Sequence, residues 1–254
     1  MLKVIVNGCH GKMGQVLINQ IEQDNELQVI AGIDKYINKE NVAFPVYDNI
    51  FECSNKADVI IDFSRPEALQ GLIDFAIRTN TPLVIATTGL SDQDMNNIKD
   101  ASNKVPIFQS ANMSVGINVL IRLAQITTKL MEDYTDIEII EKHHNLKIDA
   151  PSGTAYLIAN KINDSLKNPK EYTFGRHTKT ERRKENEIGI HAIRGGTIVG
   201  EHSVIFAGND EVIEICHSAA SKNIFALGAI RAAKFIANKK PAFYNMDDLI
   251  ETVL

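Results

Sequence analysis

Residues 141–155 hold the densest group of side chains that could carry out chemistry. Three potential cations, His143, His144 and Lys147, fall within five positions, and Pro-Ser-Gly-Thr follows at residues 151–154. Histidine titrates near working pH and can donate a proton, while a lysine nearby supplies a positive charge. The pattern therefore favours an acid–base site for an anionic small molecule.

The Pro-Ser-Gly-Thr run is typical of the start of a helix, and the apolar spacing of residues 157–162 predicts that helix. The first backbone N–H groups of a helix attract anions, and Gly153 has no Cβ to block a carboxylate. Alternatively, Ser152 or Thr154 only caps the helix and the histidines are surface residues. We favour the anion site, because the cations and the helix start lie together.

A second candidate site is the turn after the first apolar run, Leu2–Asn7, which reads Gly8-Cys9-His10-Gly11-Lys12-Met13-Gly14. Dinucleotide-binding turns follow G-x-G-x-x-G, with glycines for the tight turn and for close approach of the pyrophosphate. Here Cys9 occupies the first glycine position. Because an amphipathic helix is predicted over 15–23, its start would face the phosphates, so the turn predicts nucleotide binding.

The second predicted strand, Leu27–Ile33, ends just before Asp34, where the ribose-binding acid belongs. A carboxylate there favours the free 2′-hydroxyl of NAD, whereas Lys35 and Lys12 would attract the 2′-phosphate of NADP. Both lysines are equally consistent with solvated surface positions. We expect activity with both cofactors.

Further apolar runs at 58–63, 83–86 and 105–109 alternate with helical stretches, one of which begins near Pro66. Continuous apolar runs separated by helices predict a parallel sheet covered on both faces.

The pattern changes after Asn112, where a long helix (115–134) precedes four predicted strands with few helices between them, at 136–142, 188–194, 198–206 and 211–217. Consecutive strands predict an antiparallel or mixed sheet in a second domain. The segment from about residue 224 is helical and is expected to return to the first domain. We therefore expect a dinucleotide-binding domain at 1–113 and 223–254, and a second domain at 114–222.

The charge-dense stretch 176–187 is interpreted as a solvated loop without a ligand role.

Composition excludes several classes of protein. The net charge is −5 without a dense Lys/Arg patch, which argues against a nucleic-acid partner. Three well-separated cysteines without a Cys-x-x-Cys pair argue against a disulfide framework and a thiolate metal site, so we expect no metal. No apolar run approaches the roughly 18 residues of a membrane span. We expect a cytoplasmic protein.

The segment Glu141–Ala155 resembles the signature of the dihydrodipicolinate reductase (4-hydroxy-tetrahydrodipicolinate reductase) family, E-x-H-H-x-x-K-x-D-A-P-S-G-T-A, at every defining position. Companion segments are also similar to that family: 62–67, 87–89, 110–118, 200–202 and 210–217. One departure is Ala86, where the family commonly has glycine before Thr-Thr-Gly.

The resemblance implies an α/β fold, with a Rossmann-type parallel-sheet domain that binds NADH or NADPH. It also implies an α+β substrate domain whose open mixed sheet builds a homotetramer. The reaction would be hydride transfer to the cyclic dicarboxylate 4-hydroxy-tetrahydrodipicolinate, with loss of water, to give tetrahydrodipicolinate in lysine and diaminopimelate synthesis.

Site residues carry over by motif position. His143 matches the proton donor, and Lys147 matches a second acid/base and substrate-binding cation. The other residues expected at the substrate are His144, Ser152, Gly153 and Thr154. Those expected at the cofactor are Gly8, Cys9, His10, Gly11, Lys12, Met13, Asp34, Lys35, Ala86, Thr87, Thr88, Ser110, Ala111, Asn112 and Met113. Hinges are expected near 112–114 and 221–223.

Two other functions fit the sequence less well. Another two-domain nicotinamide dehydrogenase, acting on an amino acid or a sugar, would leave residues 143–154 unexplained. A non-catalytic redox-sensing nucleotide binder would lack acid/base residues, whereas His143 and Lys147 are both present.

Overall fold

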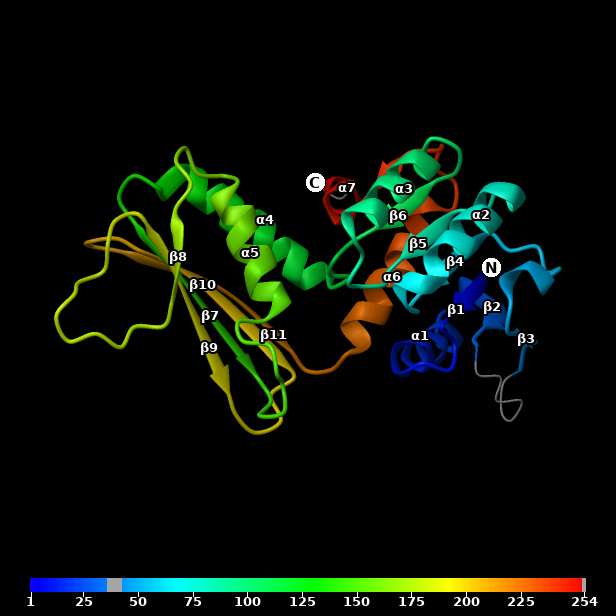
Figure 1. Cartoon of the computed structure of the whole chain (residues 1–254), viewed down its shortest axis with the longest axis horizontal. Coiled ribbons are helices and arrows are strands. Elements are labelled where there is room, and N and C mark those ends of the chain that lie inside the picture. Colours follow the sequence, from blue (N-terminus) through cyan, green and yellow to red (C-terminus); the bar gives the residue numbers. More distant parts are fainter. Residues whose placement is uncertain (36–42, 253–254) are drawn as a thin grey trace. The chain divides into compact units, whose positions relative to one another are not determined.

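The structure is a computed structural model that describes residues 1–35 and 43–252. The chain forms two compact units, one made of Met1–Val115 with Lys222–Leu254 and the other of Gly116–Ser221 (Figure 1). The chain therefore passes from one unit to the other twice, after Val115 and after Ser221.

The first unit contains a seven-stranded sheet in which every pair of neighbouring strands is parallel. In spatial order its strands are β12 (Phe243–Tyr244), β6 (Ile107–Gln109), β5 (Leu83–Ile85), β4 (Val59–Asp62), β1 (Leu2–Asn7), β2 (Leu27–Ile33) and β3 (Val46–Tyr47). Its helices are α1 (Lys12–Glu22), α2 (Leu69–Thr79), α3 (Asp92–Ser102), α6 (Asn223–Ile236) and α7 (Met246–Glu251), with 3-10 turns at Ile50–Glu52 and Pro66–Ala68.

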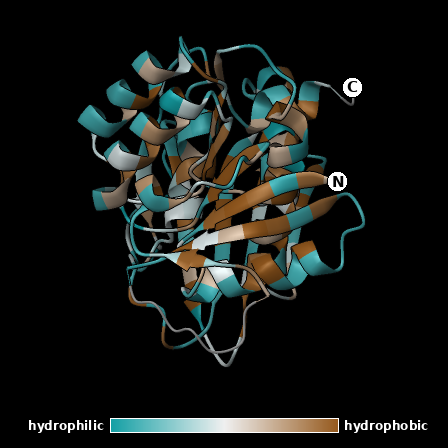
Figure 2. Cartoon of the chain, turned by 90° about the vertical axis from the view of Figure 1, so that its right-hand side faces the viewer, coloured by the Kyte–Doolittle hydropathy of each residue, from teal (hydrophilic) through white to brown (hydrophobic). Residues whose placement is uncertain are grey.

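Helices bury both faces of this sheet, which explains the continuous apolar strands. Val4 and Val6 of β1 belong to a core shared with α1 and α6, whereas Ile5 between them belongs to a core shared with α2 and α3. Figure 2 shows largely hydrophobic strands between helices that carry both hydrophilic and hydrophobic turns. The predicted parallel, Rossmann-type sheet is confirmed.

The second unit contains a five-stranded mixed sheet, in the order β11 (Val212–Ala219), β10 (Gly200–Ala207), β7 (Asp136–His143), β9 (Glu187–Arg194) and β8 (Glu171–Phe174). The central strand β7 runs antiparallel to β10 and parallel to β9. Helices α4 (Val115–Met131) and α5 (Gly153–Asn163) share an apolar core with this sheet. The predicted mixed sheet is confirmed.

Alternation along β7 decides which of its residues are buried with the helices. Ile137 and Ile139 are fully buried in the core with α4 and α5, and Glu141 and His143 continue the same series. Because successive side chains of a strand point to opposite faces, two polar residues end the apolar face of β7.

The charge-dense segment at 176–187 is exposed at most of its residues, but two of its arginines form ion pairs. Arg176 Nη2 lies 2.6 Å and Arg183 Nε 3.0 Å from Glu138 Oε1, and the Arg183 side chain is only 17% exposed. The interpretation as a solvated loop is confirmed for residues 176–186, whereas Glu187 is buried and begins β9. The half-buried Glu138 carboxylate attracts the two guanidinium groups, which explains why the Arg183 side chain is less exposed than its neighbours.

Candidate active site

The turn after β1 requires glycine at two positions. Gly8 has a φ of +77°, and a Cβ there would lie 2.6 Å from the backbone oxygen of Phe63. A Cβ on Gly14 would lie 2.0 Å from the Gly8 oxygen. The missing side chains let the chain turn tightly from β1 into α1, next to the end of β4.

Helix α1 begins at Lys12 with Gly11 as its N-cap, and within the described residues no side chain caps it. The first intrahelical bond of this turn runs from Gln15 N to Gly11 O, at 3.0 Å. The N–H groups at Lys12, Met13 and Gly14 precede that bond, as is usual in the first turn of a helix. An uncapped helix start beside a glycine turn fits the pyrophosphate of a dinucleotide.

Asp34 follows β2 and is held beside the glycine turn. Its Oδ2 accepts a hydrogen bond of 2.9 Å from the backbone N–H of His10. The exposed Lys35 comes next in the chain. The acid thus lies at the turn, as the sequence predicted, while its contact with a ribose stays a prediction.

Asp62, which the sequence reading did not single out as a functional residue, links the ends of three strands. Its Oδ1 accepts from Asn7 Nδ2 at 2.7 Å and from Ser64 Oγ at 2.6 Å, and its Oδ2 accepts from Thr87 Oγ1 at 2.7 Å. Burial raises the pKa of this carboxyl group despite these hydrogen bonds. An acid that ends an otherwise apolar strand was the available signal for such a role.

The remaining cofactor candidates follow the carboxyl ends of β5 and β6, the edge of a doubly wound sheet where ligands bind. Ala86 is buried, and its N–H donates to Asp62 O at 2.9 Å. Its φ is not positive, because among the described residues Asn80 is the one non-glycine residue with a positive φ. Alanine in place of the family glycine therefore causes no backbone strain. After β6, Ser110 Oγ donates to Asn112 O at 2.9 Å, which stabilises the turn that leads to buried Met113.

His143 ends β7 in the second unit, and its exposed fraction is 9%. Its Nδ1 lies 2.6 Å from Glu141 Oε2, whereas Nε2 has no hydrogen-bond partner among the described residues. A carboxylate only accepts hydrogen bonds, so the proton of this pair lies on Nδ1. This leaves Nε2 as the nitrogen that can exchange protons with a ligand.

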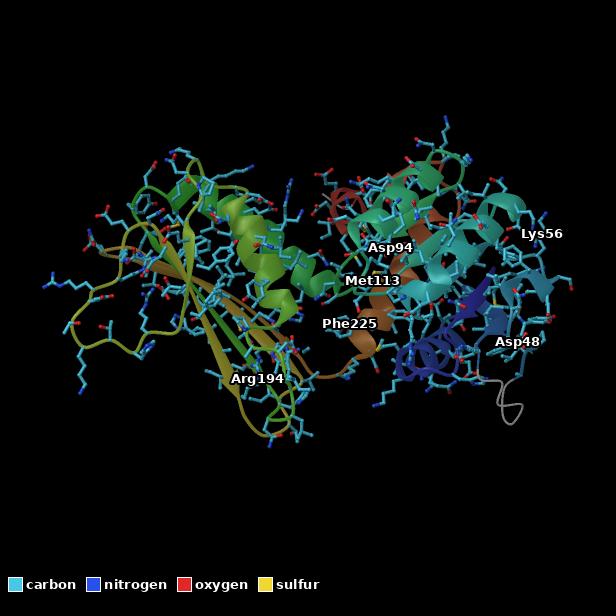
Figure 3. All side chains as sticks on the ribbon, viewed as in Figure 1. Asp48, Lys56, Asp94, Met113, Arg194 and Phe225 are labelled. Atoms are coloured by element: carbon cyan, nitrogen blue, oxygen red, sulfur yellow. The ribbon has the colours of Figure 1, made fainter. Side chains whose placement is uncertain are left out.

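Glu141 is completely buried and accepts from three groups. Besides His143, Arg194 Nη2 donates to Oε1 at 2.7 Å and Nη1 to Oε2 at 2.8 Å, while the Ser152 N–H donates to Oε1 at 3.0 Å. Burial opposes ionisation, but these hydrogen bonds outweigh it and hold the pKa of Glu141 below its usual value. Figure 3 labels Arg194 at the end of β9.

Lys147 lies in the loop between β7 and α5, and its Nζ forms an ion pair of 2.8 Å with Asp149 Oδ1. The hydrogen bond from Lys147 lowers the pKa of Asp149. The Lys147 N–H also donates to His144 O at 3.1 Å, so the two cations belong to one turn. The Lys147 ammonium is therefore paired with a carboxylate of its own loop.

Ser152 caps α5, as the alternative interpretation of the Pro-Ser-Gly-Thr run predicted. Its Oγ accepts from Ala155 N at 3.2 Å and lies 3.2 Å from His202 Nε2, so protein groups engage this hydroxyl. Gly153 is exposed, and a Cβ there would meet no atom of the protein within 4 Å. The space beside the helix start is thus open at Gly153 rather than at the Ser152 hydroxyl, and the Gly153 backbone N–H is hydrogen-bonded to the Asp149 carboxylate of the same loop.

His202 of β10 completes this group, although the sequence reading gave it no role. Its ring packs edge-to-face on His143, with 5.2 Å between centroids, and its Nδ1 is buried without a partner in the described part of the chain. Burial, with the nearby His143, lowers the pKa of His202 to about 4. His202 is therefore a neutral, buried neighbour of the proposed acid.

Residues 1–35 and 43–252 contain no group of three or more histidine, cysteine or acidic side chains arranged to hold a metal ion. In the same residues no helix has the length and hydropathy to cross a membrane.

The chain is similar to known proteins along its whole length. Residues 2–113 match the family model described as dihydrodipicolinate reductase, N-terminus, and residues 116–250 match the C-terminus model of the same enzyme. A 4-hydroxy-tetrahydrodipicolinate reductase of Caldanaerobacter subterraneus subsp. tengcongensis is 53% identical over 251 residues, which cover 99% of each chain. The Clostridium novyi enzyme of that name is 49% identical over 253 residues, again 99% of each chain.

Among solved structures, a dipicolinate-bound dihydrodipicolinate reductase from Paenisporosarcina sp. TG-14 superposes with a TM-score of 0.83. The two sequences are 22% identical, and the match covers 96% of this chain and 97% of the other. The family models, the full-length relatives and the shared fold agree with one another. The chain belongs to the dihydrodipicolinate reductase family.

Proposed function

We propose that this protein reduces 4-hydroxy-tetrahydrodipicolinate to tetrahydrodipicolinate, with loss of water, in lysine and diaminopimelate biosynthesis. NADH or NADPH is the cofactor. The environment of His143 carries the proposal. A buried carboxylate fixes its Nδ1, while its Nε2 has no hydrogen-bond partner in the described residues. Lys147 and the open helix start at Gly153 follow directly in the chain.

The first unit would hold the dinucleotide. The glycine turn and the uncapped start of α1 fit the pyrophosphate, and Asp34 with Lys35 would contact the adenosine ribose. Residues 86–88 and 110–113, at the carboxyl edge of the sheet, would line the nicotinamide side. When bound, the reduced nicotinamide supplies a hydride, which leaves negative charge on the conjugated C=N system of the substrate.

The second unit would hold the substrate and neutralise that charge. Lys147 exchanges its ion pair with Asp149 for a substrate carboxylate, while the backbone at Gly153 and Thr154 binds a carboxylate at the start of α5. His144 lies in the same turn and adds a further contact. His143 then donates a proton from Nε2 to the reduced ring, and Lys147 serves as the second acid/base.

We also propose that the chain works as a cytoplasmic homotetramer built through its second unit. Exposed apolar side chains on this sheet support an interface, since Val212 is 63%, Ile193 46% and Ile213 37% exposed. Light scattering at micromolar concentration should give about four times the chain mass of 28.2 kDa. A monomer mass would contradict the assembly without touching the reaction.

A coupled assay tests the reaction. The preceding synthase makes the substrate from pyruvate and aspartate semialdehyde, and the loss of NADH or NADPH absorbance is followed. Decay that requires both the synthase product and this protein is the expected result. No decay with either cofactor would overturn the proposed function.

A further inference from the structure

We infer that Glu141 is a positioning residue for the reduction, because it fixes the tautomer and orientation of His143 and ties that imidazole to the start of α5. The inference rests on the proposed function, since it explains how the acid of that reaction is held. Glu141 itself is fully buried and does not need to touch substrate.

Glu141 holds His143 through a direct contact. The distance of 2.6 Å from Oε2 to Nδ1 is short even for a charge-assisted hydrogen bond. An imidazole held by a carboxylate at one nitrogen presents the other in a fixed direction. A Cβ at Gly200 would lie 3.1 Å from His143 Nε2, which is closer than an ordinary van der Waals contact, so glycine at this position of β10 gives the ring room.

The surrounding residues keep the Glu141 carboxylate charged. A buried carboxylate without partners would take up a proton and could no longer stabilise a protonated imidazole. Arg194 prevents this by donating to both carboxylate oxygens, at 2.7 and 2.8 Å. Arg194 is the register partner of His143 across the parallel β7–β9 pair, so strand pairing itself places the guanidinium.

Glu141 also links the proposed acid to the proposed substrate site. The Ser152 N–H donates to Glu141 Oε1 at 3.0 Å, and Ser152 is the N-cap residue directly before Gly153. One carboxylate therefore connects β7, β9 and the first turn of α5. Its loss would loosen the acid and the carboxylate-binding backbone relative to each other.

Replacing Glu141 with Gln tests the inference. The kcat should fall about 10²-fold, the lower end of the loss expected when a general acid fails. The alkaline fall-off of kcat should move to lower pH, because the protonated imidazole of His143 would face Arg194, Lys147 and the neutral His202 without a carboxylate. KM for NADH should stay unchanged, since the dinucleotide residues lie in the other unit.

Glu138→Gln is the matched control. Glu138 lies on the same strand, accepts from His191 Nε2 at 2.6 Å and pairs with two arginines, but its side chain points to the opposite face of β7. This variant loses a comparable network, and its kcat should stay within about twofold of the wild-type value, as expected far from the chemistry. A Glu141→Gln kcat that stays within about threefold of wild type would overturn the inference.

A double variant separates positioning from stability. Glu141→Gln removes the carboxylate partner of the Arg194 guanidinium and should lower the melting temperature. Glu141→Gln combined with Arg194→Gln also removes the guanidinium charge and should restore much of the lost melting temperature. The kcat of the double variant should remain low. A kcat that recovers together with stability would show that Glu141 only balances Arg194, and would contradict the inference.

A measurement independent of activity is the tautomer of His143. Two-bond ¹H–¹⁵N spectra of the full-length protein should place the proton of the neutral ring on Nδ1 in the wild type and in Glu138→Gln. In Glu141→Gln the ring should lose this preference. An unchanged tautomer overturns the inference even where the wild type is an active reductase, whereas a wild type without activity defeats the proposed function instead.

Discussion

At the residue scale, the candidate site depends on polar side chains whose partners were not all evident beforehand. The sequence pattern indicated His143 and Lys147 because three potential cations fall within five positions of the sequence, at the end of β7 and in the turn that follows it. Strand parity places Glu141, and not Glu138, on the same face as His143, because residues two apart in a strand share a face. The sequence could not show that Arg194 and Ser152 lie against Glu141, since these contacts come from β9 and from the start of α5.

His143 carries the first prediction. His143→Gln removes the proposed proton donor and should lower kcat roughly 10²- to 10⁴-fold, the usual contribution of a general acid. NADH affinity should be nearly unchanged, because His143 belongs to the second unit. Steady-state kinetics and NADH fluorescence titration measure the two quantities. A kcat within about threefold of wild type would make Lys147 or water the proton source.

Lys35 carries the second prediction, which concerns cofactor preference. Lys35→Ala should raise KM for NADPH by several-fold, because a surface charge contact worth about 1 kcal/mol is lost. KM for NADH should hardly move, since NADH lacks the 2′-phosphate. The control is Lys99→Ala, an exposed lysine on α3, which should change neither value. Equal changes for both cofactors in Lys35→Ala would show that this lysine does not touch the phosphate.

At the element scale, buried strands were predicted closely and polar or short elements were not. The bounds of β1 and β2 agree with the sequence expectation because helices bury both faces of the parallel sheet, which leaves a continuous apolar run. Helix α3 was expected between two strands but without bounds, since only Ile98, Ala101 and Ser102 of its residues are buried. The capping box at Ser91 was the available signal for its start. The two-residue strand β12 is too short to show any periodicity.

The start of α5 carries the third prediction. Pyridine-2,6-dicarboxylate should inhibit competitively against substrate, because it presents two carboxylates on a planar six-membered ring. A Cβ at residue 153 would have no protein atom within 4 Å, so the protein can accommodate Gly153→Val. The valine side chain would then occupy the space through which a carboxylate reaches the backbone. The lost charge-assisted hydrogen bonds, roughly 1.5–3 kcal/mol, correspond to about 10- to 150-fold weaker binding.

Calorimetric titration of the inhibitor into NADH-saturated wild type, Gly153→Val and Lys147→Ala measures these affinities. Lys147→Ala should also weaken binding, and more so at low ionic strength, where its charge is least screened. Thermal unfolding checks that each variant is folded. Unchanged affinity in both variants would mean that the Pro-Ser-Gly-Thr turn acts only as a helix cap.

At the scale of the whole molecule, the proposed cofactor residues and the proposed acid belong to different units. The glycine turn, Asp34 and residues 86–88 and 110–113 lie in the first unit, whereas His143, Lys147 and Gly153 lie in the second. The sequence indicated this division through the change from alternating strands and helices to consecutive strands.

Ligand-dependent closure is the last prediction. Hydride transfer needs the reacting atoms about 3–3.5 Å apart, and the proposed cofactor and substrate residues belong to different units, so we expect both ligands together to favour a closed arrangement. We expect the backbone to turn near the two crossings, after Val115 and after Ser221. Small-angle X-ray scattering should therefore show a smaller radius of gyration with NADH and pyridine-2,6-dicarboxylate together than with either alone. His143→Gln should close as the wild type does, because its carboxylate-binding residues are intact, whereas Lys147→Ala should need more inhibitor. An unchanged radius with both ligands bound would mean that the units hold the reacting groups together without closure.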